Sequence, residues 1–426
     1  MQSAAARTRP HPRQPAHRVG ERVLRLADPS GAPLARREVE VAQTRHAFAF
    51  GSTGFELIPH ANGERDATGA FGTALADDWL GVFDTATLPF YRGDFEPQRG
   101  VTQTDRIRTA ARWFAQRGVR LKGHPLVWHT VKAAWMDELP LDDAWQVVLD
   151  RIRREVSDFR GLIDAWDVVN EAVIMPVFEN EPDGVPNVVS RIARAKGRIP
   201  LIREAFEAAR ETDPGATLLI NDFDLSSAYE CLIEGLLENG VRIDAIGLQT
   251  HMHQGYWGEE TMLAMVDRFA RYGLPLHLTE NTLVSGELMP ARIVDLNDYQ
   301  PASWPSTAEG EARQADEIVR HYRSLVEHPA VQSITYWGIT DAGAWLGAPA
   351  GLLRVDGSHK PAYEALRDLV RGEWWLPPTR TRTDDNGVVR VSGFLGDYRV
   401  TAGAARAAFA IESAGTDATV APLTLA

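Results

Sequence analysis

Two glutamates stand at the ends of short apolar segments, where a buried strand has no need of a carboxylate. Glu171 follows Asn170 at the end of LIDAWDVVN (162–170), and Glu280 ends LPLHLTE (274–280). Paired carboxylates about 5–5.5 Å apart perform retaining glycoside hydrolysis, in which one attacks the anomeric carbon while the other donates a proton and later activates water. The acid must stay protonated beside an ionised nucleophile, which a neighbouring negative charge favours. We therefore predict that the two glutamates form a catalytic pair.

Other polar and aromatic side chains end segments of the same kind. They are His124, Trp128, Asn170, Asn221, Asp222, Gln249, His251, His253, Trp337, Asp341 and Trp345. Asn170 is placed to donate a hydrogen bond to a sugar hydroxyl, and such a bond can strengthen in the transition state. His251 is a candidate partner for the nucleophilic carboxylate. Tryptophans offer flat apolar area to a pyranose ring, so Trp128, Trp337 and Trp345 are predicted to wall a sugar site.

The histidine pair also supports a hypothesis from a different class. His251 and His253 are two residues apart on an expected strand, so their side chains point the same way. Metal-dependent barrel hydrolases need such a pair, with further ligands here from His124, Asp222 or Glu280. We prefer a site without metal or cofactor, because the carboxylate pair explains more of the strand ends. A non-catalytic sugar-binding protein is disfavoured because both glutamates are present.

These residues must be positioned by the elements between residues 46 and 372, where short apolar segments alternate with segments of helical periodicity. The expected strands are HAFAFGST (46–53), VFDTATLPF (82–90), VRLKGHPLVW (119–128), LIDAWDVVN (162–170), ATLLIND (216–222), IDAIGLQTH (243–251), LPLHLTE (274–280) and VQSITYWGIT (331–340). The expected helices cover 106–118, 143–159, 201–213, 229–240, 259–273 and 309–328. This alternation predicts an α/β fold, a (β/α)8 TIM barrel whose catalytic groups lie at the C-terminal ends of the strands. A doubly wound sheet is the runner-up, and FGSTGF (50–55) is a poor version of its phosphate-binding turn.

The chain on either side of this region has a different pattern. Residues 19–45 and 374–426 each contain a strand, an Asp/Asn/Gly turn and a second strand, with turns at 28–31 and 385–387. Each reads as a β-hairpin, and a lone hairpin is marginally stable. We expect the two segments to join as a small accessory β-sandwich-like domain beside the barrel of 46–372. The alternative is that each segment adds to the barrel separately. Residues 1–18 lack an apolar core for a signal peptide and are predicted to be a disordered leader.

Charge and cysteine content restrict the partners and the compartment. A formal net charge of −13 argues against nucleic acid and anionic membrane surfaces, which attract basic proteins. No apolar stretch is long enough to span a bilayer. The single cysteine, Cys231, allows no internal disulfide and fits a reducing compartment, so we expect a cytoplasmic enzyme. We expect it to be a monomer or a homo-oligomer.

Six motifs together resemble a known family. GHPLVWH, WDVVNEA, LLINDFDL, IGLQTHMH, HLTE and ITYWGITDAGAW occur in this order. They are similar to the strand-end motifs of glycoside hydrolase family 10, the retaining endo-xylanase family of the (β/α)8 glycosidase clan. The resemblance implies that Glu171 is the acid/base and Glu280 the nucleophile. It implies that the sugar site is lined by His124, Trp128, Asn170, Gln249, His251, Trp337 and Trp345.

The chain departs from this family at places that bear on substrate. The family's ENEMKW-like motif, which grips sugars on the non-reducing side, is replaced by TLPFYRGDFEPQRG (87–100), where Tyr91 and Arg92 stand instead. The Tyr that usually follows ND is Phe223, and TENTLVSGEL opens a polar loop after the second glutamate. The reaction type should survive, since both glutamates remain. The long loops 172–198 and 281–309 could close the cleft and favour exo-action on xylo-oligosaccharides, other small glycosides or a non-xylose sugar.

Overall fold

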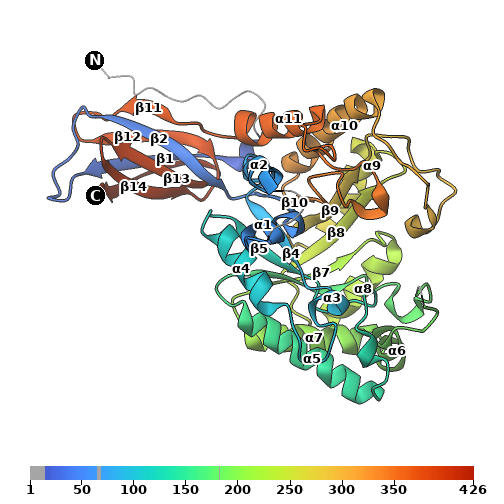
Figure 1. Cartoon of the computed structure of the whole chain (residues 1–426). Coiled ribbons are helices and arrows are strands. Elements are labelled where there is room, and N and C mark those ends of the chain that lie inside the picture. The colour runs from blue at the N-terminus through green and yellow to red at the C-terminus, as the bar shows by residue number, and fades with distance from the viewer. Residues whose placement is uncertain (1–14, 65–68, 182) are drawn as a thin grey trace. The chain divides into compact units, whose positions relative to one another are not determined.

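The computed structural model describes residues 15–64, 69–181 and 183–426, so most of the predicted leader lies outside the described residues. The chain divides into two compact units, residues 51–362 and residues 1–50 with 363–426. Figure 1 shows both units, with those elements labelled for which there is room.

A closed barrel of parallel strands carries the predicted site. Within the described part of the chain, eight strands close it in the order β10-β3-β4-β5-β6-β7-β8-β9. They are β3 (Ala49–Thr53), β4 (Thr85–Pro89), β5 (Arg120–His124), β6 (Ala165–Asn170), β7 (Thr217–Asp222), β8 (Ala245–Met252), β9 (Leu276–Leu283) and β10 (Val331–Tyr336). Strands covered on both faces read as nearly continuous apolar runs, which is why all eight could be located in the sequence. The predicted (β/α)8 fold is confirmed.

Helices follow most of these strands. They are α1 (Ile58–Ala61), α2 (Gly69–Leu80), α3 (Arg92–Phe95), α4 (Thr104–Ala115), α5 (Leu141–Asp158), α6 (Val188–Lys196), α7 (Arg198–Thr212), α8 (Ser227–Glu238), α9 (Glu259–Ala270), α10 (Ala308–Glu327) and α11 (Pro361–Arg367). Short helical turns occur at η1 (Ala16–Arg18), η2 (Phe55–Leu57), η3 (Ala134–Met136), η4 (Met175–Val177), η5 (Leu296–Asp298), η6 (Trp345–Gly347) and η7 (Asp368–Glu373). Thr307 and Ser226 cap α10 and α8 by accepting hydrogen bonds from the backbone N–H groups of Gly310 and Ala228.

The terminal segments build two further sheets. Among the described residues of this unit, one sheet has the order β12-β1-β15 and the other β11-β2-β13-β14. Their strands are β1 (Val19–Ala27), β2 (Glu38–His46), β11 (Thr379–Arg382), β12 (Val388–Phe394), β13 (Gly396–Ala402), β14 (Ala405–Ile411) and β15 (Gly415–Thr424). An apolar cluster with members from both sheets includes Leu24, Val41, Val391 and Tyr398, all buried.

The two predicted hairpins are wrong, because the strands of each belong to different sheets. β1 pairs antiparallel with β12 and parallel with β15, whereas β2 pairs with β11 and β13. The turns at 28–31 and 385–387 therefore lie on connections between strands of different sheets. Asp28 accepts hydrogen bonds from the backbone N–H groups of Ser30 and Ala32, as the turn signal predicts. A local turn motif thus specified the turn and not the pairing of the flanking strands.

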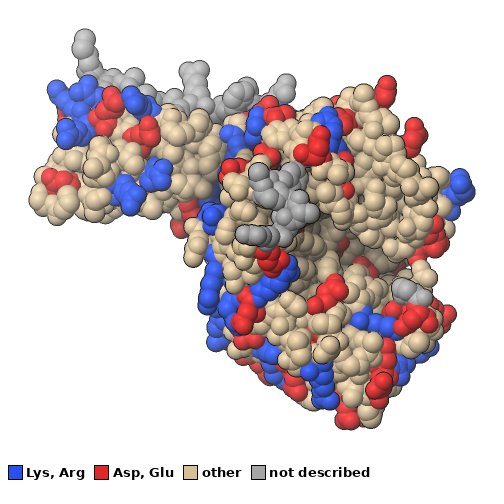
Figure 2. All heavy atoms as spheres, in the orientation of Figure 1, with Lys and Arg blue, Asp and Glu red and all other residues tan. Residues whose placement is uncertain are grey.

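The surface carries both signs of charge. On the face shown in Figure 2, Lys and Arg are interspersed with Asp and Glu. Among the described residues, every helix is too short or too polar to cross a membrane.

Candidate active site

The predicted site residues lie at the C-terminal ends of the barrel strands. His124 ends β5, Asn170 ends β6 and Asn221 is the penultimate residue of β7. Gln249 and His251 belong to β8, Glu280 to β9, and Trp337 follows β10. Because all strands run parallel, these ends meet at one mouth of the barrel.

Two amide side chains link the two glutamates. The Asn221 Nδ2 group donates to Asn170 Oδ1 at 2.8 Å and to Glu280 Oε1 at 3.1 Å. Asn170 Nδ2 in turn donates to Glu171 Oε1 at 3.2 Å. The Thr279 hydroxyl donates to Asn221 Oδ1 at 2.6 Å, which fixes the orientation of that amide. The two carboxyl groups therefore face one shared site.

Glu171 has the environment of a group that holds its proton near neutral pH. Burial raises its pKa to about 8, and the charges of Glu280 and Asp222 add to the rise, against hydrogen bonds from Trp128 and Gln249. Trp128 Nε1 donates to Glu171 Oε2 at 2.7 Å, and Gln249 Nε2 lies 3.4 Å from Oε1. A carboxylic acid with a raised pKa can donate a proton at the pH where an ordinary glutamate is ionised.

The backbone at Glu171 is held in an unfavourable conformation. Its φ of +56° lies in the left-handed region, which costs a residue other than glycine on the order of 1–3 kcal/mol. Asp222 Oδ2 accepts the backbone N–H of Val173 at 2.9 Å, and Arg198 Nε donates to the carbonyls of Ala172 and Val173 at 3.1 and 3.0 Å. These bonds fix the turn that aims the Glu171 side chain into the mouth.

Glu280 is contacted by two histidines. His251 Nε2 lies 3.0 Å from Glu280 Oε2, and His124 Nε2 lies 3.9 Å from Oε1. For a hydrogen bond to an ionised Glu280, His251 must carry a proton on Nε2. Its Nδ1 can then accept a hydrogen bond from the Thr282 hydroxyl, 3.4 Å away. The predicted proximity of His251 to this carboxyl group is what the structure shows.

A buried charge network below His124 was missed by sequence reasoning. His124 Nδ1 lies 2.8 Å from Asp167 Oδ2, and Lys122 Nζ lies 2.7 Å from the same oxygen. Burial opposes ionisation of Asp167, but the Lys122 charge and the His124 hydrogen bond hold its pKa below the ordinary value. An ionised Asp167 orients the His124 ring toward Glu280. The sequence signal for this network was Lys122 within the apolar run 119–128 and Asp167 within the apolar run 162–170.

Aromatic side chains surround the carboxyl pair. The Trp337 ring centroid lies 5.3 Å from that of His124, and the Tyr91 centroid lies 5.5 Å from that of Trp128. Trp345 is 39% exposed, and its ring lies 5.0 Å from His251. Partly exposed aromatic rings beside buried carboxyl groups suit the apolar face of a sugar.

Two predicted binding residues have other contacts. The buried guanidinium of Arg92 lies 3.2 Å from Glu96 Oε2 and 5.2 Å from the Trp135 ring centroid, so its charge serves an ion pair. His253 is buried, and burial together with the neighbouring His251 lowers its pKa to about 3. The Thr282 hydroxyl lies 3.5 Å from His253 Nδ1, and the His253 ring centroid lies 5.2 Å from that of Trp345. Both side chains are buried and in contact with neighbouring protein groups.

The histidine pair has the Glu280 carboxyl group beside it. Among the residues that the structure describes, no cluster of three or more His, Cys, Asp and Glu side chains has the arrangement of a metal site. The His251 ring faces Glu280, and the two histidine rings lie 5.8 Å apart.

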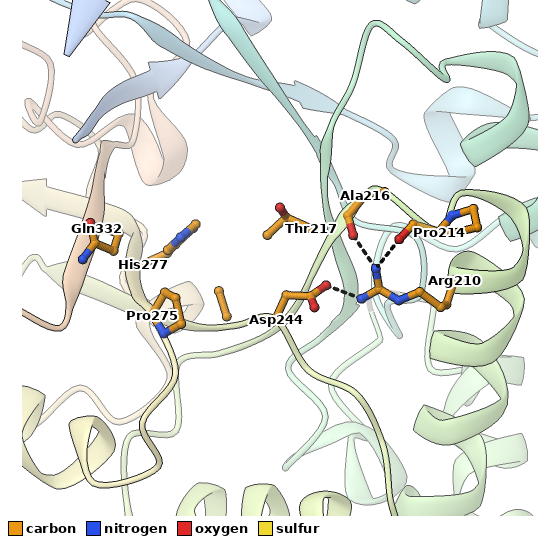
Figure 3. A pocket seen from close by; sticks show the side chains of 10 residues that line it. Arg210, Pro214, Ala216, Thr217, Asp244, Pro275, His277 and Gln332 are labelled. Carbon is orange, nitrogen blue, oxygen red and sulfur yellow. Dashed lines mark hydrogen bonds and ion pairs between the residues drawn. The ribbon is translucent and has the colours of Figure 1, made fainter. Parts of the chain in front are cut away.

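A separate cavity lies at the other end of the strands. Figure 3 shows its lining side chains, which come from the starts of β7 to β10 and the segments before them. Its volume is about 490 Å³. Its arginine, Arg210, forms an ion pair with Asp244 and donates to the carbonyl of Ala216 at 2.6 Å. The cavity holds no carboxyl pair and is not the candidate active site.

Comparisons with known proteins relate this chain to a family of glycosyl hydrolases. The family model for glycosyl hydrolase family 10 matches residues 92–369. Anti-sigma-I factor RsgI6 of Acetivibrio thermocellus is 25% identical over 385 residues, 89% of this chain and 44% of that protein. This chain therefore spans less than half the length of that relative. Endo-1,4-beta-xylanase B of Thermotoga neapolitana is 29% identical over 262 residues, 58% of this chain and 68% of that protein.

A solved structure shares the fold. Xylanase 10B of Thermotoga petrophila RKU-1, crystallised in complex with xylobiose, matches with a TM-score of 0.61 and 22% identity, over 76% of this chain and 94% of that one. At this identity the likeness shows the barrel fold alone.

Proposed function

Because this chain belongs to glycosyl hydrolase family 10, we propose that it is a retaining glycoside hydrolase that cleaves β-glycosidic bonds of xylo-oligosaccharides or related small glycosides by double displacement. The observation that carries the proposal is the hydrogen-bonded series Glu171–Asn170–Asn221–Glu280, which brings two carboxyl groups to one site. The family and its xylanase relatives support xylose as the sugar. A cytoplasmic location, and hence soluble short substrates, remains part of the proposal.

In the first step Glu280 attacks the anomeric carbon as a carboxylate. The bond from this carbon to the leaving oxygen breaks, a glycosyl ester to Glu280 forms, and Glu171 transfers its proton to the departing oxygen. His251 and Asn221 contact the two oxygens of Glu280, so they hold the carboxyl group in position for attack.

In the second step Glu171 has lost its proton and acts as a base. It removes a proton from a water molecule, the water oxygen bonds to the anomeric carbon, and the ester to Glu280 breaks. Two inversions at the same carbon leave the product with the β-configuration. The hydrogen bonds from Trp128 and Gln249 stabilise the negative charge that Glu171 carries in this step.

Aryl β-glycosides of several pentoses and hexoses test the proposed function. We expect turnover of the aryl β-xyloside, with the β-anomer appearing first when the product is followed by proton NMR before mutarotation. Activity should persist in chelator. The α-anomer appearing first would indicate inversion, and loss in chelator with recovery in zinc would favour a metal-dependent reaction at His251.

The pH dependence follows from the pKa of Glu171. Below about pH 8 the carboxyl group holds its proton and can act as the acid; above it the proton is lost. We therefore expect kcat/KM for a poor leaving group to fall about tenfold for each pH unit above 8, because only the protonated enzyme reacts. A dinitrophenyl xyloside is the control, since its leaving group needs no proton and this decline should disappear. A decline for both substrates at the same pH would point to another group.

A further inference from the structure

The loop after β6 and the loop after β9 are joined by a hydrogen bond, although β7 and β8 lie between these two strands in the barrel. Asn180, in the loop after β6, donates from Nδ2 to Oδ2 of Asp295, in the loop after β9, at 2.8 Å. In the barrel order β6, β7, β8 and β9 are consecutive, so the bond joins loops separated by two strands. The skipped strands carry Asn221, Gln249 and His251. We call this hydrogen bond the loop bridge.

The loop after β9 is a fixed element with its own packing. Its residues Val284, Met289 and Trp304 form a small buried cluster with Ala348 and Ala350 from the loop after β10. The Trp304 indole N–H donates to the carbonyl of Glu287 at 2.7 Å. An apolar cluster of this kind resists displacement by a substrate, because opening it would expose its side chains to water.

The loop after β8 supports the same structure. Gln254 Nε2 donates to the carbonyls of Pro290 and Ile293 at 3.1 and 2.7 Å, and Met289 N–H donates to the carbonyl of His253 at 2.9 Å. The loop after β9 is thus bonded to the loops after both β8 and β6. This sector of the mouth is therefore bounded by loops that hydrogen bonds hold to one another.

The opposite sector is bounded by a continuous series of aromatic rings. Phe55, after β3, lies 5.7 Å from Trp337 and 5.9 Å from Tyr91, measured between ring centroids. Tyr91 lies 5.5 Å from Trp128. Burial and the charges of Glu280 and Glu171 raise the pKa of Tyr91 well above its ordinary value, so its hydroxyl stays neutral. The series joins the ends of β10, β3, β4 and β5.

We infer that the mouth admits a chain end or a short glycoside rather than the interior of a long chain, and that the loop bridge determines this specificity. The inference rests on the proposed function. A polymer threaded across the carboxyl pair needs an open sector on each side of the barrel axis. Here one sector holds the bridged loops and the other holds the ring series, so a long chain can bind interior linkages only when the bridge opens.

The test compares two rates on purified full-length protein. On a soluble xylan, the fall in viscosity per reducing end formed reports cleavage of interior linkages. Turnover of an aryl β-xyloside reports the chemistry. For the unaltered protein we expect reducing ends to accumulate while viscosity barely changes. A steep fall in viscosity at the same extent of reaction would overturn the inference while leaving the proposed function intact.

Variants of the bridge sharpen the test. Asn180→Ala removes the donor and should raise interior cleavage about fivefold, the factor that corresponds to one net hydrogen bond. Asn180→Asp keeps the shape of the side chain but places its carboxylate against that of Asp295. The increase in interior cleavage should therefore be larger than for Asn180→Ala and should shrink in high salt. Neither variant should change aryl xyloside turnover by more than about twofold.

Asn297→Ala is the matched control. Asn297 is exposed and lies in the loop after β9, as Asp295 does, and its side chain donates to Asp295 Oδ1 at 3.0 Å. The bridge uses the other oxygen, Asp295 Oδ2, so removing the Asn297 side chain leaves the bridge in place. For Asn297→Ala, the ratio of the fall in viscosity to the reducing ends formed should equal that of the unaltered protein. Equal ratios in all four proteins would show that the bridge does not determine specificity. Absence of aryl β-xyloside turnover in all four would instead contradict the proposed function.

Discussion

Glu280→Ala is expected to abolish turnover of every glycoside that the protein accepts, by a factor on the order of 10⁵ or more. The physical reason is that the Glu280 carboxylate is the nucleophile in the proposed reaction, and the other carboxyl group at the site, Glu171, holds a proton up to about pH 8. Steady-state rates on aryl β-xylosides with good and poor leaving groups measure the effect.

The matched variant for Glu280→Ala is Glu280→Gln, which preserves the shape of the side chain. It still meets Asn221 and His251, so a loss of activity with an unchanged melting temperature separates chemistry from folding. Turnover of a dinitrophenyl xyloside by Glu280→Ala within about tenfold of the unaltered protein would contradict the assignment.

Glu171→Ala is expected to act selectively on substrates. A dinitrophenyl leaving group needs no proton, so the glycosyl ester should still form, whereas poor leaving groups should lose about 10³- to 10⁴-fold. Hydrolysis of the ester then becomes rate-limiting, because no base activates water. Added azide should restore the rate and give a β-azide, since it attacks the ester without needing a base.

The stereochemistry of the azide product decides between the two assignments. Rescue of Glu280→Ala with an α-azide, and no rescue of Glu171→Ala, would mean that the two roles are exchanged. Trp128→Phe is a useful companion, because it removes a hydrogen bond to Glu171 and keeps an aromatic ring. It should raise the pKa of Glu171 and move the alkaline decline in rate to higher pH.

The barrel could be predicted because its strands are isolated apolar runs, several of which end in polar groups. β7 shows this clearly: Leu218, Leu219 and Ile220 are fully buried and lead directly to Asn221 and Asp222. Both glutamates were found in the same way. The terminal sheets could not be derived similarly, since the partner of Val23 in β1 is Arg390 in β12, and no local pattern encodes a pairing over that separation.

The parts of the site that escaped prediction depend on tertiary contacts. Arg198, whose guanidinium bonds to the Glu171 turn, begins a helix and reads as an ordinary surface cation. Arg92 follows a strand end and is predicted to bind sugar, and the structure adds an ion pair with Glu96, one helical turn later. The sequence shows that Arg92 and Glu96 are four residues apart, and the folded chain shows that they form an ion pair.

The interleaving of β1 between β12 and β15 constrains how this unit folds. A ribosome releases β1 hundreds of residues before either neighbour exists, so both of its edges lack partners while the barrel segment is made. Pairing across such a separation pays a large chain-closure entropy and belongs among slow folding events. Until then β1, with the apolar side chains of Val23, Leu24 and Leu26, is a segment on which chaperones or other nascent chains can act.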